Sequence, residues 1–195
     1  MREFHDTNFY KADMQKGIEW AQTSTGTVCL EQGKKAPKIL HKYGDTQLEP
    51  LHTDRYAKGV YFYLWSKPLT NYYHTMLDAV GCLTRYYRVL DQHPNCILLV
   101  NGTPRMGLKN YPPFVAELLD LLDIRWEFTD PTTQYEHVYF GDTGAQDANM
   151  KRQQPGAEYW HLIDRIVHLS QKETVPIYEK IYLSRRAHAN PLNNR

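Results

Sequence analysis

The sequence predicts an α/β protein built on a Rossmann-like, doubly wound sheet, and three observations support this prediction. Apolar runs of strand length alternate with amphipathic segments of helical period between residues 59 and 184. The run CILLV at 96–100 is continuously apolar, as expected of a strand buried in a parallel sheet, and it ends at Asn101-Gly102. A chain of 195 residues with 42% hydrophobic and 23% charged residues is long and apolar enough for a folded core.

The elements are expected in a fixed order along the chain. Residues 1–58 form an irregular N-terminal region with short strands, of which 27–30 and 37–42 are the candidates. An aromatic and β-branched strand follows at 59–65, and Thr70 or Asn71, both favourable N-cap residues, then opens a helix that stops before Pro94. The remaining elements are a strand at 96–100, a helix at 112–123, short strands at 126–129 and 137–140, a helix at 158–170 and a strand at 180–184.

Composition and charge argue against several classes of protein. The formal net charge is +1 and no basic stripe is present, so nucleic acid is not expected as a partner. No run of eighteen apolar residues and no N-terminal apolar segment occur, so neither a membrane span nor a secretory signal is expected. Cys29, Cys82 and Cys96 form no metal-type pair and suggest a reducing compartment. Because no signal peptide or membrane anchor is visible, we expect a cytoplasmic location.

The helix that begins at residue 70 or 71 is expected to carry a polar stripe. At about 100° per residue, four polar side chains fall within one narrow sector: Asn71, His74, Asp78 and Arg85. Five apolar side chains fall roughly opposite: Tyr73, Met76, Val80, Leu83 and Tyr87. Tyr72, Tyr73, Tyr86 and Tyr87 are expected to be packing residues rather than a sugar-stacking surface.

The spacing of His74 and Asp78 gives this stripe a possible chemistry. The two residues are four positions apart, so the carboxylate can hold the imidazole in one tautomer and raise its basicity. An imidazole prepared in this way can remove a proton from a hydroxyl group. Polar stripes are also typical of solvent-exposed helix faces, so the pattern alone leaves both interpretations open.

Several segments resemble glycosyltransferase family 61. The segment WSKPLTNYYHTMLD at 65–78 resembles the Asn-x-x-His-x-x-x-Asp motif of this family. CILLV at 96–100 and FVAELLDLLDI at 114–124 are similar to the strand and the helix that follow the motif. KIYLSRR at 180–186 resembles the family's Lys-Ile-Tyr-x-Ser-Arg segment, and the resemblance as a whole covers roughly residues 60–195.

The resemblance implies an inverting glycosyltransferase of GT-B architecture, in which two Rossmann-like domains face a cleft. Such an enzyme transfers a sugar from a nucleotide-sugar donor, commonly a UDP-sugar, to a glycan or glycoprotein acceptor. By this resemblance His74 and Asp78 are the catalytic residues near the acceptor, and Ser184 and Arg185 bind the donor phosphates. We prefer His74 as the base with Asp78 as its orienting partner, but the spacing does not decide between them.

Three further residues are candidates for contacts with the substrate. Asn71 would offer an amide from the helix start, and Arg85 lies on the same polar stripe. Asn101 follows a predicted strand, and ligands in such sheets bind outside the carboxyl ends of the strands. The segment from Ser184 to Arg186 has a second interpretation, since a strand can simply end in solvent with its arginines on surface carboxylates. No resident cofactor and no metal site are predicted, and no Asp-x-Asp motif occurs.

The family pattern continues beyond the Ser-Arg segment with an Asn-Glu pair and a second domain, whereas this sequence ends at Arg195. We therefore expect a Rossmann-like acceptor-side domain at 59–179 and, at 180–195, the start of a truncated donor-binding domain that a C-terminal domain would complete. The alternative is a non-catalytic, single-domain protein that binds carbohydrate or nucleotide. A hydrolase that uses the His–Asp pair is a weaker alternative, because no Gly-x-Ser-x-Gly motif is present.

Overall fold

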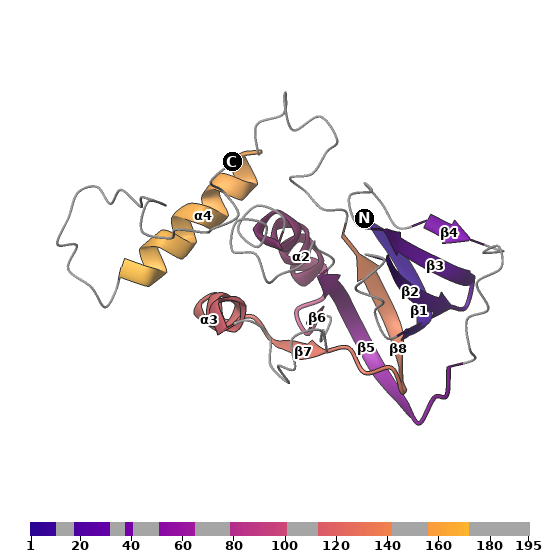
Figure 1. The fold of residues 1–195 in the computed structure, drawn as a ribbon. Coiled ribbons are helices and arrows are strands. Elements are labelled where there is room, and N and C mark those ends of the chain that lie inside the picture. The colour runs from indigo at the N-terminus through magenta and orange to yellow at the C-terminus, as the bar shows by residue number, and fades with distance from the viewer. Residues whose placement is uncertain are drawn as a thin grey trace, which may run out of the picture.

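The structure is a computed structural model of the chain, and it describes residues 1–10, 18–31, 38–40, 51–64, 79–100, 113–141 and 156–171. Within these ranges eight strands form one mixed sheet, with helices beside it (Figure 1). The elements are β1 (Arg2–Phe9), β2 (Ile18–Thr23), β3 (Gly26–Glu31), β4 (Lys38–Leu40), β5 (Arg55–Leu64), α2 (Val80–Gln92), β6 (Ile97–Val100), α3 (Pro113–Leu121), β7 (Trp126–Phe128), β8 (Thr133–Phe140) and α4 (Ala157–Ser170). The predicted α/β class is confirmed.

Four neighbouring strands, in the spatial order β7-β6-β5-β8, run parallel to one another. They correspond to the strands predicted at 59–65, 96–100, 126–129 and 137–140, although β8 begins earlier than predicted, at Thr133. β5 and β6 pair from Tyr61 opposite Ile97 to Leu64 opposite Val100, so their carboxyl ends lie side by side. β5 begins at Arg55, earlier than the predicted start at residue 59. Arg55 and Lys58 are polar, so the first residues of the strand do not form an apolar run in the sequence.

The other half of the sheet is antiparallel and comes from the first forty residues. β1 pairs with β8, and β2, β3 and β4 follow in order, each antiparallel to its neighbour. The strands predicted at 27–30 and 37–42 are confirmed as β3 and β4. Neither β1 nor β2 was predicted, and the sequence of β1, REFHDTNF, is mostly polar. The structure nevertheless buries Phe4 and Phe9 of this strand.

Each face of the sheet has its own apolar cluster. The described helices α2, α3 and α4 all contribute to one cluster, together with Phe62, Leu64, Leu98 and Val100 of the central strands. They therefore lie on the same side of the sheet, as Figure 1 also shows. None of these described helices is long and apolar enough to cross a lipid bilayer. A doubly wound arrangement, with helices on both faces, stays a prediction.

The second cluster, on the opposite face, is rich in aromatic residues. Phe9 stacks on Tyr63 with ring centroids 4.6 Å apart, and Phe4 meets Phe140 edge to face at 5.0 Å. These four rings come from β1, β5 and β8, three strands that are adjacent in the sheet. The cluster therefore ties the antiparallel half of the sheet to the parallel half.

The three cysteines are buried and form no disulfide bond. Burial raises the pKa of the Cys96 thiol to about 12, so this side chain stays protonated at neutral pH. A buried, protonated thiol packs as a small apolar side chain and is a poor nucleophile.

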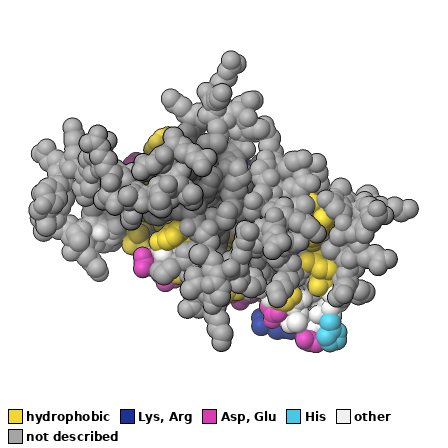
Figure 2. All heavy atoms as spheres, viewed as in Figure 1, with side chains coloured by type: hydrophobic (Ala, Val, Ile, Leu, Met, Phe, Trp, Pro, Cys, Tyr) yellow, Lys and Arg dark blue, Asp and Glu magenta, His cyan; other side chains and the backbone are white. Residues whose placement is uncertain are grey.

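Charged side chains of both signs gather on one part of the surface. Figure 2 shows histidine, acidic and basic side chains together at the lower right of the drawn face, next to hydrophobic side chains. Side chains of both charges thus share this part of the described surface.

Candidate functional site

Arg85 is the one predicted site residue that lies within the described part of the chain. It is half-buried on α2. The other six predicted site residues lie outside the described residues: Asn71, His74, Asp78, Asn101, Ser184 and Arg185. The predicted helix start at Thr70 or Asn71 and the predicted strand at 180–184 lie outside them as well.

The described part of α2 shows which of its faces is buried. Val80 and Leu83 are fully buried, as predicted, and Tyr86 is buried more deeply than the predicted Tyr87. The Tyr86 hydroxyl donates a hydrogen bond to the carbonyl of Cys96 at 3.1 Å, and burial raises its pKa to about 12. Tyr86 is therefore a packing residue, as expected from the sequence.

The face of α2 that carries Arg85 is not uniformly polar. Val89, one turn after Arg85, is only 1% exposed, whereas Arg88, Asp91 and Gln92 are exposed. The solvent-exposed face of the described helix is thus rotated away from the predicted stripe. Arg85 lies at the border between the buried and the exposed surface, where a side chain can reach either.

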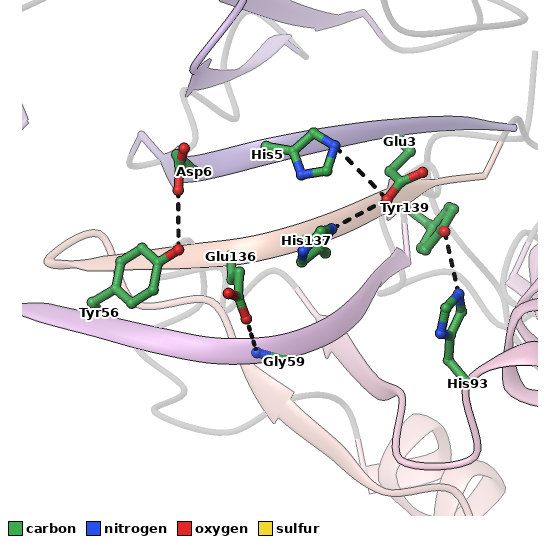
Figure 3. Close-up of polar contacts among 9 residues, drawn as sticks. All are labelled: Glu3, His5, Asp6, Tyr56, Gly59, His93, Glu136, His137 and Tyr139. Atoms are coloured by element: carbon green, nitrogen blue, oxygen red, sulfur yellow. Dashed lines mark hydrogen bonds and ion pairs between the residues drawn. The ribbon is translucent and has the colours of Figure 1, made fainter.

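A second group of polar side chains lies on the paired strands β1 and β8 (Figure 3). His5 and His137 are direct partners across the antiparallel ladder, and their rings meet edge to face at 4.4 Å. The Oε1 atom of Glu3 lies 3.2 Å from Nδ1 of His137 and 3.9 Å from Nε2 of His5. We name these three residues, Glu3, His5 and His137, the imidazole–carboxylate cluster.

Tyr139 connects this cluster to the end of α2. Burial, followed by the nearby carboxylate of Glu3, raises the pKa of the Tyr139 hydroxyl. The hydroxyl is therefore protonated at neutral pH, and Tyr139 is the direct partner of Glu3 across the ladder. The same hydroxyl lies 3.4 Å from Nε2 of His93, just after α2 (Figure 3). Three histidines, one carboxylate and one phenol thus form a continuous polar row.

A cavity of about 560 Å³ adjoins this row. Its lining comes from residues 58–61 of β5, residues 92–97 between α2 and β6, and Arg125 just before β7. His93 belongs both to the lining and to the polar row. The cavity therefore lies at the amino ends of β6 and β7, the end of the sheet opposite to that at which ligands usually bind in such folds.

A β-bulge shapes one wall of this cavity. The pairing of β5 with β8 shifts between Ala57 and Val60, and Gly59 within the shift has a φ of +122°. The Gly59 amide donates a hydrogen bond of 2.7 Å to Oε2 of Glu136 (Figure 3). A side-chain carboxylate thus satisfies a backbone donor that the bulge removes from the ladder.

Gly59→Ala is expected to lower the free energy of unfolding by about 1–3 kcal/mol, because alanine is strained at this φ. The nearest side-chain atom to an added Cβ is Tyr61 Cε2 at 4.0 Å, so the cost would come from the backbone and not from a clash. Urea unfolding measures it. Gly156→Ala is the matched control, since Gly156 has a φ of −64° and open space around it. If Gly59→Ala and Gly156→Ala lowered the free energy of unfolding equally, backbone strain at Gly59 would not be the cause of the loss.

A surface ion pair joins α2 to α4. Arg88 donates two hydrogen bonds, of 2.6 and 2.7 Å, to the carboxylate of Glu158. The guanidinium of Arg165 lies 5.4 Å from the centroid of the Tyr87 ring. Both contacts involve exposed charged side chains, and each joins α2 to α4. We therefore interpret them as contacts between the two helices and assign them no role in ligand binding.

The imidazole–carboxylate cluster was not among the predicted sites. Glu3 and His137 are 134 positions apart, and neither lies in a recognisable ligand spacing. The alternation of Glu3 and His5 along one strand was the available signal, since residues two apart share a face. Their partner on the next strand depends on the pairing register, which the sequence does not specify for a polar strand.

Comparisons of the chain with family models, with curated proteins and with solved structures found no significant match. The resemblance to glycosyltransferase family 61 therefore rests on the quoted motifs and their order.

Proposed function

We propose that the chain is the acceptor-side part of an inverting glycosyltransferase that uses a nucleotide-sugar, most simply a UDP-sugar, as its donor. One observation carries the proposal. The segment 65–78, with its Asn-x-x-His-x-x-x-Asp pattern, follows directly after Leu64, the last residue of β5, and is separated from Val80, the first residue of α2, by Ala79 alone. In the sequence, the motif therefore lies in the connection between the central parallel strand β5 and the helix α2.

The strand order supports the choice of this position. In order of appearance, the parallel strands lie 3-2-1-4 across the sheet, which is the order of the first four strands of a dinucleotide-binding sheet. The chain passes outward from β5 to β6 and β7 and then returns to the other side of β5 as β8. Such a reversal is a topological switch point, and ligands bind there at the carboxyl ends of the strands.

The reaction needs a base on the acceptor and a cation on the leaving group. In the proposed step His74 takes the proton of an acceptor hydroxyl, and that oxygen attacks the anomeric carbon of the donor. The bond from this carbon to the nucleotide phosphate breaks, and the configuration inverts. Asp78 would orient the imidazole, while Asn71, Asn101 and Arg85 would contact the substrates. Ser184 and Arg185 would stabilise the charge that develops on the diphosphate.

Nucleotide release tests the proposal. The purified chain would be incubated with UDP-sugars and oligosaccharide acceptors, and released UDP and the anomeric configuration of the product would be measured. Transfer with inversion supports the proposal, and transfer with retention contradicts it. Saturation-transfer NMR on the same mixtures would show whether sugar or nucleotide binds. Absence of both transfer and binding would overturn the proposal.

The alternative, a non-catalytic carbohydrate- or nucleotide-binding protein, is favoured by one feature. The 560 Å³ cavity has the volume of a small-molecule site and is lined by polar groups that include Lys58, His93 and Arg125. Binding without transfer that is lost in Arg125→Ala but kept in His74→Ala would favour this alternative, because Arg125 lines the cavity whereas His74 is the proposed catalytic base.

A further inference from the structure

We propose that the imidazole–carboxylate cluster of Glu3, His5 and His137 binds one divalent transition-metal ion, specifically Zn²⁺. This inference does not depend on the proposed transfer reaction. It rests on the geometry of three donor atoms, on the strands that hold them and on the residue that supports the carboxylate.

The donor atoms already lie at distances close to those of a metal site. Glu3, His5 and His137 each offer one ligand atom, and these three atoms all lie within 4.8 Å of one another. Ligands about 2.0–2.1 Å from a tetrahedral zinc ion are themselves about 3.3 Å apart. The separations of 3.2 and 3.9 Å from Glu3 to the two imidazoles bracket this value. Small side-chain rotations would bring all three atoms onto one ion.

The backbone, rather than a loop, holds these side chains together. His5 and His137 are paired residues in the antiparallel ladder of β1 and β8, and Glu3 lies two residues before His5 on the same face. The Cβ atoms of directly paired residues are about 4.5–5.5 Å apart. The positions of the ligands are therefore set by eight-residue strands and by the register between them.

Tyr139 is placed to support the carboxylate from outside the set of ligands. It is the direct partner of Glu3 across the ladder of β1 and β8, and its hydroxyl lies 3.4 Å from Nε2 of His93. In the proposed site this hydroxyl would donate a hydrogen bond to Glu3, which would fix the orientation of the carboxylate and leave its other oxygen for the ion.

The types of ligand determine which metal ion is expected, and the exposure of the three side chains allows an ion to reach them from solvent. Two imidazoles and one carboxylate suit Zn²⁺, whereas Mg²⁺ and Ca²⁺ prefer oxygen ligands alone. The side chains of Glu3, His5 and His137 are 39%, 50% and 36% exposed, so an ion can enter from solvent. Three protein ligands leave one tetrahedral position for water.

Metal titration tests this inference. The full chain is prepared without a histidine tag and stripped of metal before the titration. Isothermal titration with Zn²⁺ is expected to show a site that weakens at least about tenfold in His5→Ala and in His137→Ala, and by about tenfold in Tyr139→Phe. His52→Ala is the matched control. Its imidazole lies 2.9 Å from Asp54 on the surface, but the pair belongs to no three-ligand cluster among the described residues.

Cobalt spectroscopy provides an independent measurement. Co²⁺ bound to the chain is expected to give visible absorption bands without a thiolate band, and Zn²⁺ but not Mg²⁺ is expected to remove them. Glu3→Gln and His137→Ala, each checked for native circular dichroism, are expected to lose the bands. Unchanged zinc affinity in these two variants would overturn the proposal and leave the cluster as a set of ion pairs. An equal loss of zinc affinity in His52→Ala would also overturn the proposal.

Discussion

His74→Ala is expected to lower the rate of sugar transfer by about 10²–10⁴-fold, the usual contribution of a positioned general base. The acceptor hydroxyl has a high pKa and attacks slowly unless a base removes its proton as the new bond forms. Binding of the donor would change little, because the diphosphate contacts come from other residues. The effect should therefore appear in kcat rather than in KM for the donor, as measured by UDP release.

Two further variants make this prediction specific. Asp78→Asn keeps the size and removes the charge, so the imidazole loses its orienting carboxylate, and a smaller decrease than in His74→Ala is expected. His161→Ala removes an exposed imidazole from α4 and is expected to leave the rate unchanged. If Asp78→Asn abolished transfer while His74→Ala retained it, Asp78 would be the base and the assignment of roles would be wrong.

Phe140→Ala is expected to lower the free energy of unfolding by about 3–5 kcal/mol, the usual cost of removing a buried phenylalanine ring. Phe140 is fully buried at the end of β8. Its ring centroid lies 5.0 Å from Phe4, 5.8 Å from Phe9 and 5.5 Å from Tyr63. Small domains are stable by about 5–15 kcal/mol in total, so this variant would lose a large part of its stability.

Phe128→Ala is the matched control for this loss. Phe128 is 36% exposed on β7, and it meets Trp126 edge to face at 5.3 Å. Such an aromatic pair contributes about 0.5–1.5 kcal/mol, so a loss of about that size is expected. Urea unfolding followed by tryptophan fluorescence would measure both variants. Similar losses in the two would show that the aromatic cluster does not stabilise the sheet as argued.

The central elements were predictable because burial marks them in the sequence. β6 lies between two parallel neighbours, so almost every position of CILLV is apolar and the strand is visible without an alignment. The helical period of Val80, Leu83 and Leu90 likewise reports contact with the sheet. β1 gave no such signal. Only two of its residues, Phe4 and Phe9, are apolar, its buried positions include the polar Thr7 and Asn8, and its pairing with β8 spans more than a hundred positions of sequence.

The candidate site was less predictable than the fold, and for a different reason. A helical wheel divides a helix into two faces, whereas α2 is contacted by the sheet and by α4, so its buried surface is wider and includes Val89. Arg85 is therefore half-buried at the border of the exposed face rather than at its centre. The cluster around His137 depends on strand register, and register is a property of the pairing of two segments rather than of either segment alone.

The continuity of the sheet across β1 and β8 has a consequence for anyone who shortens this protein. The ladder between these strands runs from Arg2 opposite Phe140 to Asn8 opposite Gln134. If the protein were shortened to start at residue 59, β8 would become an edge strand with unpaired amide and carbonyl groups and with uncovered aromatic rings. Such an edge strand pairs readily with another copy of itself, so the shortened chain would be prone to aggregate.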